Sequence, residues 1–378
     1  MSKKEIDSLV KRSPVLLACR EENILQTADW IQYYLQLNNV KTLKKIVIKS
    51  PDILGYSVTM LEGKMKYYQE TFGWTNTELT KVLTTTSRII SYSTKENIEP
   101  KRQWLCNTFN HVTKDDVSKL IKKSPLVLLA NLNDMVDRLE FLQDQLELNS
   151  TQATWNLLWK APNVLALTKD TLNDKISWFQ SSSSSSSSSL GLTKKETAKL
   201  IKSLPTLLHT SIDNNLEPTL KWLNNRFGQA AVVKRMVTAL PAILAYSIVE
   251  KTEPQLEFLQ VTFGLNNASE LSNMTCKYPS ILGYNQASME EKIQFYATCV
   301  GSRPDALDFI RRNPRLLGAS LDQRLIPRWN QVLEFELPEH GFTVPISNLA
   351  VYSNAKWTLY LEKRKGRISN ITEDASVM

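Results

Sequence analysis

A phrase that recurs at nearly constant spacing is the feature that most constrains the fold of this chain. Its clearest copy, LIKKSPLVLL at 120–129, reads as the last turn of a helix, a proline that ends the helix, and a short aliphatic run. The proline or its substitute recurs at nine positions: Pro14, Pro51, Ser87, Pro125, Pro162, Pro205, Pro241, Pro279 and Pro314. Successive positions lie 37, 36, 38, 37, 43, 36, 38 and 35 residues apart. Such a period is typical of a solenoid, whose stacked units share one continuous core.

The residues before each proline predict a first helix of about three turns, with the proline counted as position 0. Position −12 holds Ser2, Asn39, Thr75, Thr113, Ser150, Thr193, Gln229, Asn267 and Ser302, and eight of these nine are good N-caps. An acidic residue three positions later predicts capping boxes at Ser2–Glu5, Thr75–Glu78 and Thr193–Glu196. Aliphatic residues at −8, −5 and −4 then share one helical face.

The residues after each proline predict a short turn and a second helix. Positions +2 and +3 are aliphatic in all nine copies, and we name this pair the plug because it should fill the space between units. Position +6 is a second capping residue in eight copies, with Arg20 as the exception. Prolines near the start of the second helix and glycines just after its end support these bounds. They are Pro100, Pro218, Pro254, Gly73, Gly228, Gly264 and Gly301.

Three departures interrupt the pattern. Ser87 replaces a proline, so we expect a softer end to the first helix of the third copy. Nine consecutive serines, Ser181–Ser189, enter the second helix of the fifth copy and predict a flexible loop without a core. Beyond the ninth copy the pattern weakens. We therefore expect the solenoid to span 1–343 and a C-terminal cap with a basic, disordered tail to span 344–378.

Composition excludes several classes of protein. A net charge of +8 permits a polyanionic partner without requiring one. Four scattered cysteines without a C-x-x-C pair, and three isolated histidines, predict a reducing compartment and no metal site. The chain has no Gly-rich phosphate loop and no hydrolase or metalloprotease motif, so we expect neither an enzyme nor a cofactor or small-molecule substrate. No apolar run is long enough for a membrane span, and no targeting leader is visible.

The recurring phrase, an aliphatic helix followed by Lys/Arg-Ser-Pro-x-Leu-Leu, resembles the repeat of the mitochondrial transcription termination factor (mTERF) family. The segments IKSPDILGYS at 48–57 and KYPSILGYN at 277–285 match it closely, and the resemblance covers residues 2 to about 330. It implies an all-α fold: a curved, right-handed-type α-solenoid of about nine repeats of 35–38 residues, each with two α-helices and a short 3₁₀ turn. It also implies a basic concave face that binds nucleic acid, typically double-stranded DNA, in mitochondria or chloroplasts.

The best candidates for binding nucleic acid are the cations at positions −3 and −2, in the last turn of the first helices. They are Lys11, Arg12, Lys49, Lys122, Lys123, Lys160, Lys202, Lys277, Arg311 and Arg312. Equivalent positions in a stack form a stripe, which suits a phosphate backbone. The alternative is that such lysines only complement the helix dipole and keep the surface soluble.

An arginine cluster in the ninth copy and the following helix adds Arg303, Arg315, Arg324 and Arg328 to Arg311 and Arg312. Arginine favours bidentate phosphate or guanine contacts, although Asp305, Asp308 and Asp322 could neutralise several of these side chains. Nine tryptophans could stack on bases, but at helical spacing they more often belong to a core.

Three hypotheses about function remain open. The first is an organellar regulator or terminator of transcription that binds duplex DNA as a monomer. The second is an organellar RNA-binding factor in intron splicing or ribosome maturation. The third is a solenoid scaffold that binds proteins. The sequence does not identify the target site or distinguish mitochondrion from chloroplast.

Overall fold

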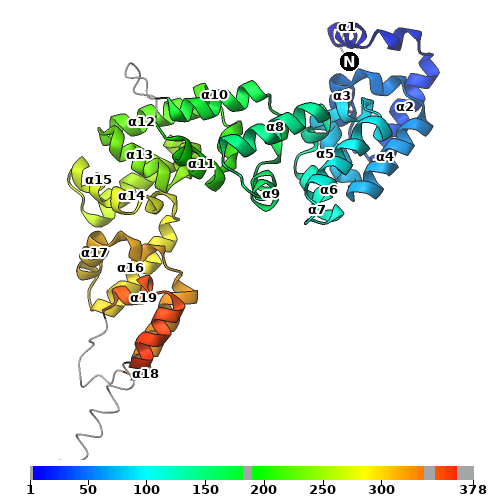
Figure 1. Cartoon of the computed structure of the whole chain (residues 1–378). Coiled ribbons are helices and arrows are strands. Elements are labelled where there is room, and N and C mark those ends of the chain that lie inside the picture. Colours follow the sequence, from blue (N-terminus) through cyan, green and yellow to red (C-terminus); the bar gives the residue numbers. More distant parts are fainter. Residues whose placement is uncertain (1–2, 182–189, 336–344, 364–378) are drawn as a thin grey trace, which may run out of the picture. The chain divides into compact units, whose positions relative to one another are not determined.

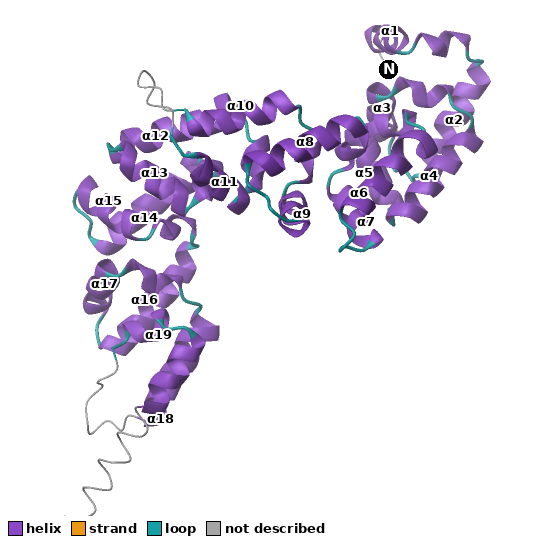
Figure 2. Cartoon of the chain, viewed as in Figure 1, coloured by secondary structure: helices purple, strands orange, loops and turns teal. Residues whose placement is uncertain are grey.

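The computed structural model describes residues 3–181, 190–335 and 345–363, and this part of the chain consists of helices and loops without a strand (Figures 1 and 2). The predicted all-α solenoid is confirmed. Residues 3–181 together with 191–210 form one compact unit, and the residues from Ser211 onward form a second. The division falls inside the sixth copy, between its plug and its second helix. The Ser182–Ser189 part of the serine tract lies outside the described residues.

Nine first helices precede the plugs, as predicted. They are α1 (Lys3–Arg12), α3 (Val40–Lys49), α5 (Asn76–Thr86), α7 (Lys114–Lys123), α9 (Thr151–Lys160), α11 (Lys194–Ser203), α13 (Ala230–Ala239), α15 (Ala268–Lys277) and α17 (Arg303–Arg312). The −12 side chain accepts a backbone hydrogen bond in α3, α5, α7, α9, α11, α15 and α17. The capping boxes Thr75–Glu78 and Thr193–Glu196 are confirmed, and Thr113–Asp116 forms another. Gln229 makes no side-chain cap, and Ser2 lies outside the described residues.

Each plug is a one-turn 3₁₀ helix that starts at position 0. These helices are η1 (Pro14–Ala18), η2 (Pro51–Gly55), η3 (Ser87–Ser91), η5 (Pro125–Leu129), η6 (Pro162–Ala166), η7 (Pro205–His209), η9 (Pro241–Ala245), η11 (Pro279–Gly283) and η12 (Pro314–Gly318). The residue before each proline is non-helical, for example Ser50 at φ −137° and ψ 80°, because a proline ring disfavours the helical conformation there. Successive plugs touch one another within each unit, so their aliphatic side chains form the central row of the core.

The second helices follow the +6 caps. They are α2 (Glu21–Tyr34), α4 (Val58–Phe72), α6 (Glu99–Thr108), α8 (Leu132–Gln145), α10 (Lys169–Gln180), α12 (Glu217–Phe227), α14 (Glu253–Phe263), α16 (Gln286–Val300) and α18 (Ile326–Phe335). All eight predicted +6 caps accept a backbone hydrogen bond. The glycines Gly73, Gly228, Gly264 and Gly301 have positive φ at the helix ends, where an L side chain would be strained.

Four second helices begin with a π turn that accommodates one extra residue. These turns are η4 (Thr94–Ile98), η8 (Ile212–Leu216), η10 (Ile248–Thr252) and η13 (Leu321–Leu325). In each turn the amide of the last residue bonds to the carbonyl of the cap serine five residues earlier, as in Ile98 N to Ser93 O at 3.1 Å. A proline follows two residues later in all four copies. The insertion therefore shifts the numbering of the second helix by one without changing its packing face.

A ladder of side-chain donors joins each copy to the next. Position +13, or +14 after a π turn, holds Thr27, Lys64, Lys101, Arg138, Lys175, Thr219, Gln255, Lys292 and Arg328. Every one except Thr219 donates to a backbone carbonyl in the next plug or one residue after it. The Lys101 Nζ–Leu128 O and Lys292 Nζ–Leu317 O distances are 2.6 and 2.8 Å. Most of these carbonyls have no partner inside the one-turn helix, although Ile281 O also accepts the Tyr284 amide.

The last donor shows that part of a tenth copy follows the ninth. Arg328 donates to Leu349 O and Tyr352 O, at 2.8 and 2.9 Å, on α19 (Ser347–Val351) and the residue after it. Leu349 and Ala350 are buried at the +2 and +3 positions counted from Ser347. At +6, Ser353 Oγ accepts the Lys356 amide and begins helix 354–363. The C-terminal segment thus ends the stack with a plug and a second helix.

Candidate nucleic-acid interface

Charge is divided between the two sets of helices. The first helices carry 24 Lys/Arg and 9 Asp/Glu residues. The second helices with their π turns carry 14 Lys/Arg and 22 Asp/Glu residues. Six of those 14 cations are ladder donors that bond to carbonyls. The modest net charge of the chain is therefore the sum of a strongly basic row of first helices and an acidic row of second helices.

The cations at position −2 reach forward to the next copy. Arg12 Nη2 donates to Lys49 O at 2.9 Å, and Lys49 Nζ donates to Thr85 O at 3.4 Å. Lys123 Nζ donates to Trp159 O at 3.3 Å and lies 3.5 Å from the centre of the Trp159 ring. These side chains are exposed, and their partners are carbonyls at a helix C-terminus rather than carboxylates. They complement the helix dipole, as the alternative interpretation predicted, yet keep their full charge at the surface.

The cations at position −3 reach back to the preceding copy. Lys122 Nζ lies 2.8 Å from Glu78 Oε1, and Arg311 Nη2 lies 3.3 Å from Glu270 Oε1. Lys202 donates to Glu147 O at 3.1 Å. The direction differs from that at −2 because neighbouring residues on a helix project about 100° apart. Since two of these cations face carboxylates, position −3 contributes less unneutralised charge than position −2.

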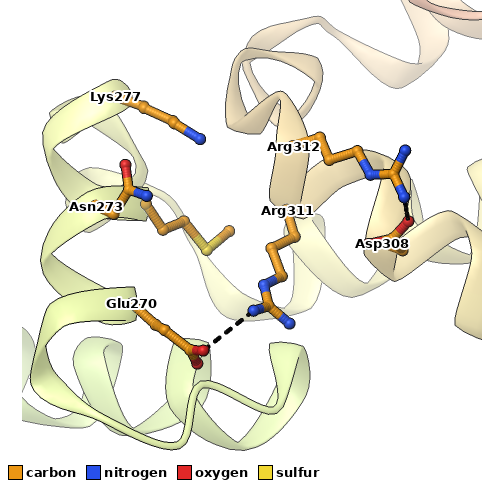
Figure 3. A pocket seen from close by; sticks show the side chains of 7 residues that line it. Glu270, Asn273, Lys277, Asp308, Arg311 and Arg312 are labelled. Carbon is orange, nitrogen blue, oxygen red and sulfur yellow. Dashed lines mark ion pairs between the residues drawn. The ribbon is translucent and has the colours of Figure 1, made fainter.

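Several predicted cations are exposed without a carboxylate within ion-pair distance in the part of the chain that the structure describes. They are Lys11, Lys160, Lys277 and Arg315. Lys277 on α15 and Arg311 on α17 border an opening of about 320 Å³, shown in Figure 3. Arg312 instead turns to Asp308 of its own helix at 2.5 Å, so one of the three predicted internal neutralisations occurs. This pair is largely exposed and contributes little to stability.

The arginines of the predicted cluster have different partners and different degrees of burial. Arg303 pairs with Glu290 on α16, and Arg324 is half-buried, with Nη1 3.4 Å from Ala350 O. The prediction that Arg328 binds nucleic acid is wrong, because its side chain is only 4% exposed and is the ladder donor to the tenth plug. Burial lowers the pKa of Arg328, in keeping with its loss of water. The sequence pattern grouped the buried Arg328 with arginines that are exposed, because burial cannot be read from residue type.

One cation that the sequence analysis missed joins the −2 residues of the first unit. Arg88, at position +1, is exposed and borders a groove of about 630 Å³ with Arg12, Lys49, Asp52 and Tyr92. The signal was present in the sequence, because Arg88 occupies the same position in its copy as Arg315 does in the ninth. The groove brings three cations from three successive copies to one surface.

The basic row has gaps. Thr85, Ser203 and Ala239 occupy position −2 in the third, sixth and seventh copies. The first unit therefore carries Arg12, Lys49, Lys123 and Lys160, and the second unit carries a separate set around Lys277. Among the tryptophans considered for stacking, Trp155 is buried, whereas Trp159 is half-buried beside Lys123.

Comparison with known proteins agrees with the repeat. The mTERF family model matches residues 1–112, 71–188 and 185–358. This chain belongs to the mTERF family. It is also 22% identical over 247 residues to the chloroplastic transcription termination factor MTERF8 of Arabidopsis thaliana. That match covers 57% of this chain and 47% of the relative, so the chain spans about half of that protein's length.

The described residues contain neither the side-chain group of a metal site nor a helix able to span a membrane. No group of three or more His, Cys, Asp and Glu side chains there could hold a metal ion. No helix in the same residues is long and apolar enough to cross a membrane. The four cysteines, Cys19, Cys106, Cys276 and Cys299, are all free thiols.

Proposed function

We propose that this mTERF-family protein binds double-stranded DNA in an organelle through its basic row of first helices and thereby regulates or terminates transcription. The observation that carries the proposal is the difference between positions −2 and −3. The −2 cations Arg12, Lys49 and Lys123 are anchored to carbonyls, so they are held in place without being neutralised. Anchored, unneutralised cations at equivalent positions of several copies suit a phosphate backbone.

The acidic row of second helices supports a one-sided mode of binding. A polyanion would be attracted to the first helices and repelled by the second helices, so the duplex should lie along one face rather than wrap the protein. We place Lys11, Arg12, Lys49, Arg88, Lys123 and Lys160 in the binding surface of the first unit, and Lys277, Arg312 and Arg315 in that of the second. Lys122, Lys202 and Arg311 contribute more weakly because they are engaged with the preceding copy.

The name of the Arabidopsis relative supports a role in transcription and a chloroplast location for that protein. We extend the role to this chain, and we propose an organelle, mitochondrion or chloroplast, as its location. The second candidate function is organellar RNA binding, for which the same row of cations would serve, because backbone charge does not distinguish the two duplexes.

Fluorescence anisotropy with labelled duplex DNA, duplex RNA and single strands, repeated at several salt concentrations, tests the proposal. We expect duplex DNA to bind most tightly, with log K falling linearly against log[salt] by about 0.9 for each neutralised phosphate. Tighter binding to RNA would replace the proposal with the second candidate. If none of these nucleic acids binds at low salt, the remaining hypothesis is a solenoid scaffold that binds proteins.

A further inference from the structure

The gaps in the basic row at position −2 are matched by cations at position −6. The third, sixth and seventh copies lack a cation at −2, and their residues at −6 are Lys81, Lys199 and Arg235. The second and fourth copies carry a cation at both positions, with Lys45 and Lys119 at −6. All nine copies therefore have a lysine or an arginine at −6 or −2. Among the residues at these two positions, Asp308 is the one acidic residue.

Position −6 faces away from the core. The buried stripe of a first helix lies at −8, −5 and −4, and successive residues are about 100° apart around the helix. Position −6 is therefore roughly opposite this stripe, between −2 and −3, and about 40° from −2. A ligand that approaches a first helix from the solvent meets the side chain at −6 directly.

Four of the five cations at −6 have none of the contacts that hold the side chains at −2 and −3. They are exposed, and in the described part of the chain none has a side-chain hydrogen bond or a carboxylate within ion-pair distance. We name them the outward cations: Lys45, Lys81, Lys199 and Arg235. Lys119 differs, because its Nζ lies 2.6 Å from Asp115 Oδ2 of its own helix.

The helix dipole does not explain the outward cations either. They precede the last turn of their helices, and the dipole favours a positive charge only within that turn. The structural explanation that accounts for a cation at −2 therefore does not account for one at −6.

Side chains at −6 and −2 of one helix reach the same part of the surface. Figure 3 shows this in the ninth copy, where Arg312 Nη2 at −2 lies 2.5 Å from Asp308 Oδ2 at −6. The two positions are one helical turn apart, about 6 Å along the axis. A cation at −6 can therefore meet a phosphate that lies over the first helix when position −2 carries no charge.

We propose that position −6 is a second phosphate-binding position, and that Lys81, Lys199 and Arg235 bind the nucleic-acid backbone in the copies where position −2 cannot. This inference rests on the proposed function, because it completes the same surface. In the first unit the row of cations would follow −2 in the first two copies, −6 from the second to the fourth, −2 in the fourth and fifth, and −6 in the sixth. The row changes position at the second and fourth copies, which carry both cations, and again between the fifth and the sixth. A polyanion would thus meet a cation in every copy of each unit.

Anisotropy with labelled duplex DNA across salt concentrations tests the inference. Lys45, Lys81 and Lys199 are changed to Gln in one variant, and the second-helix cations Lys66, Lys95 and Lys169 in a control of equal charge. We expect the first variant to lose about 2 to 3 from the magnitude of the slope of log K against log[salt], near 0.9 for each lost phosphate contact. The control should keep the slope of the unmodified chain.

Moving two cations within their helices gives a second readout. Lys81→Gln with Lys199→Gln should lower the magnitude of the slope by about 2. Adding Thr85→Lys and Ser203→Lys returns both cations at position −2, and we expect the slope to return to that of the unmodified chain. All the changed side chains are exposed, so thermal unfolding should be the same in every variant.

Three results would overturn the inference. They are an unchanged slope in the Lys45, Lys81 and Lys199 variant, an equal loss in the control, and a loss that the cations returned at −2 do not restore. If the unmodified chain binds duplex DNA and only the −2 lysines Lys49, Lys123 and Lys160 lower its slope, the inference fails while the proposed function stands. If the unmodified chain does not bind duplex DNA at low salt, both fail.

Discussion

The carboxylate of Glu99 shows how one residue makes stability depend on pH. It accepts hydrogen bonds from Tyr67 Oη at 2.7 Å, Arg102 Nε at 2.9 Å and Gln103 Nε2 at 3.0 Å. The Arg102 hydrogen bond, aided by that of Tyr67 and opposed by partial burial, lowers the pKa of Glu99 to about 2. Burial, aided by the hydrogen bond to Glu99, raises the pKa of Tyr67. The ionised form of Glu99 is therefore favoured in the folded chain.

Acid titration of Glu99→Gln tests this arrangement. The unfolded carboxyl has a pKa of about 4.5, so the stabilisation is complete above that pH and is lost as the pH falls towards 2. Urea midpoints at pH 7 and pH 3 should show a smaller acid-induced loss in Glu99→Gln than in the unmodified chain. Glu140→Gln, at an exposed position without a partner among the described residues, should leave that loss unchanged. Equal acid sensitivity of Glu99→Gln and the unmodified chain would contradict the assignment.

Lys101 tests the donor ladder. Its ammonium is buried, burial lowers its pKa, and its Nζ lies 2.6 Å from Leu128 O. Lys101→Met keeps most of the side-chain volume but leaves that carbonyl without its donor. We expect a loss of about 1–2 kcal/mol in the free energy of unfolding, because relief from burying a charge offsets part of the lost hydrogen bond. Lys95→Met, at an exposed site in the same copy, should change it by less than about 0.5 kcal/mol. Similar effects of both substitutions would argue against the ladder.

At the scale of the element, the third copy shows what the proline contributes. In the proline copies one non-helical residue separates the first helix from the plug, whereas α5 extends to Thr86 and η3 begins at Ser87. Ser87 has φ −54°, which a proline adopts, its hydroxyl is buried without a partner, and its amide makes no hydrogen bond to the described residues. Thr86, at φ −133° and ψ 40°, still leaves the helical conformation before η3, so the third copy keeps a break between the first helix and the plug without a proline.

Ser87→Pro should therefore stabilise the first unit. The ring restricts the unfolded chain and removes a buried, unpaired hydroxyl, so we expect a gain of about 0.5–1 kcal/mol by urea denaturation. Thr86→Pro is the matched control, because it places the ring one residue earlier, within the last turn of α5, and should destabilise the unit. Destabilisation by Ser87→Pro would show that a proline ring does not fit the third copy.

The elements were predictable because their signals are local. The caps, the proline breaks and the +2/+3 plugs each depend on residues adjacent in sequence, and the structure confirms them. The role of position +13 was not predictable, because its acceptor is a backbone carbonyl, 27 residues away for Lys101 and Arg138, and every residue type has such a carbonyl. Arg328 was misassigned for this reason, and the tenth plug was missed because Ser347 replaces its proline.

At the scale of the whole molecule, the division of charge decides where a polyanion would bind. The sequence revealed the −3/−2 cations but not their directions, which depend on how one copy rotates onto the next. It also predicted one elongated body, whereas contacts divide the described chain into two units. Each unit keeps the basic first helices, so the proposed function does not depend on how the units are arranged.

The most direct test of the proposed interface compares two triple variants of equal charge. Lys49, Lys123 and Lys160 are changed to Gln in one variant, and the second-helix cations Lys66, Lys95 and Lys169 in the other. Anisotropy with duplex DNA across salt concentrations then gives two slopes of log K against log[salt]. We predict that the first variant loses about 2 to 3 from the magnitude of the slope and that the second keeps the slope of the unmodified chain. Equal losses in both variants would contradict binding through the first helices.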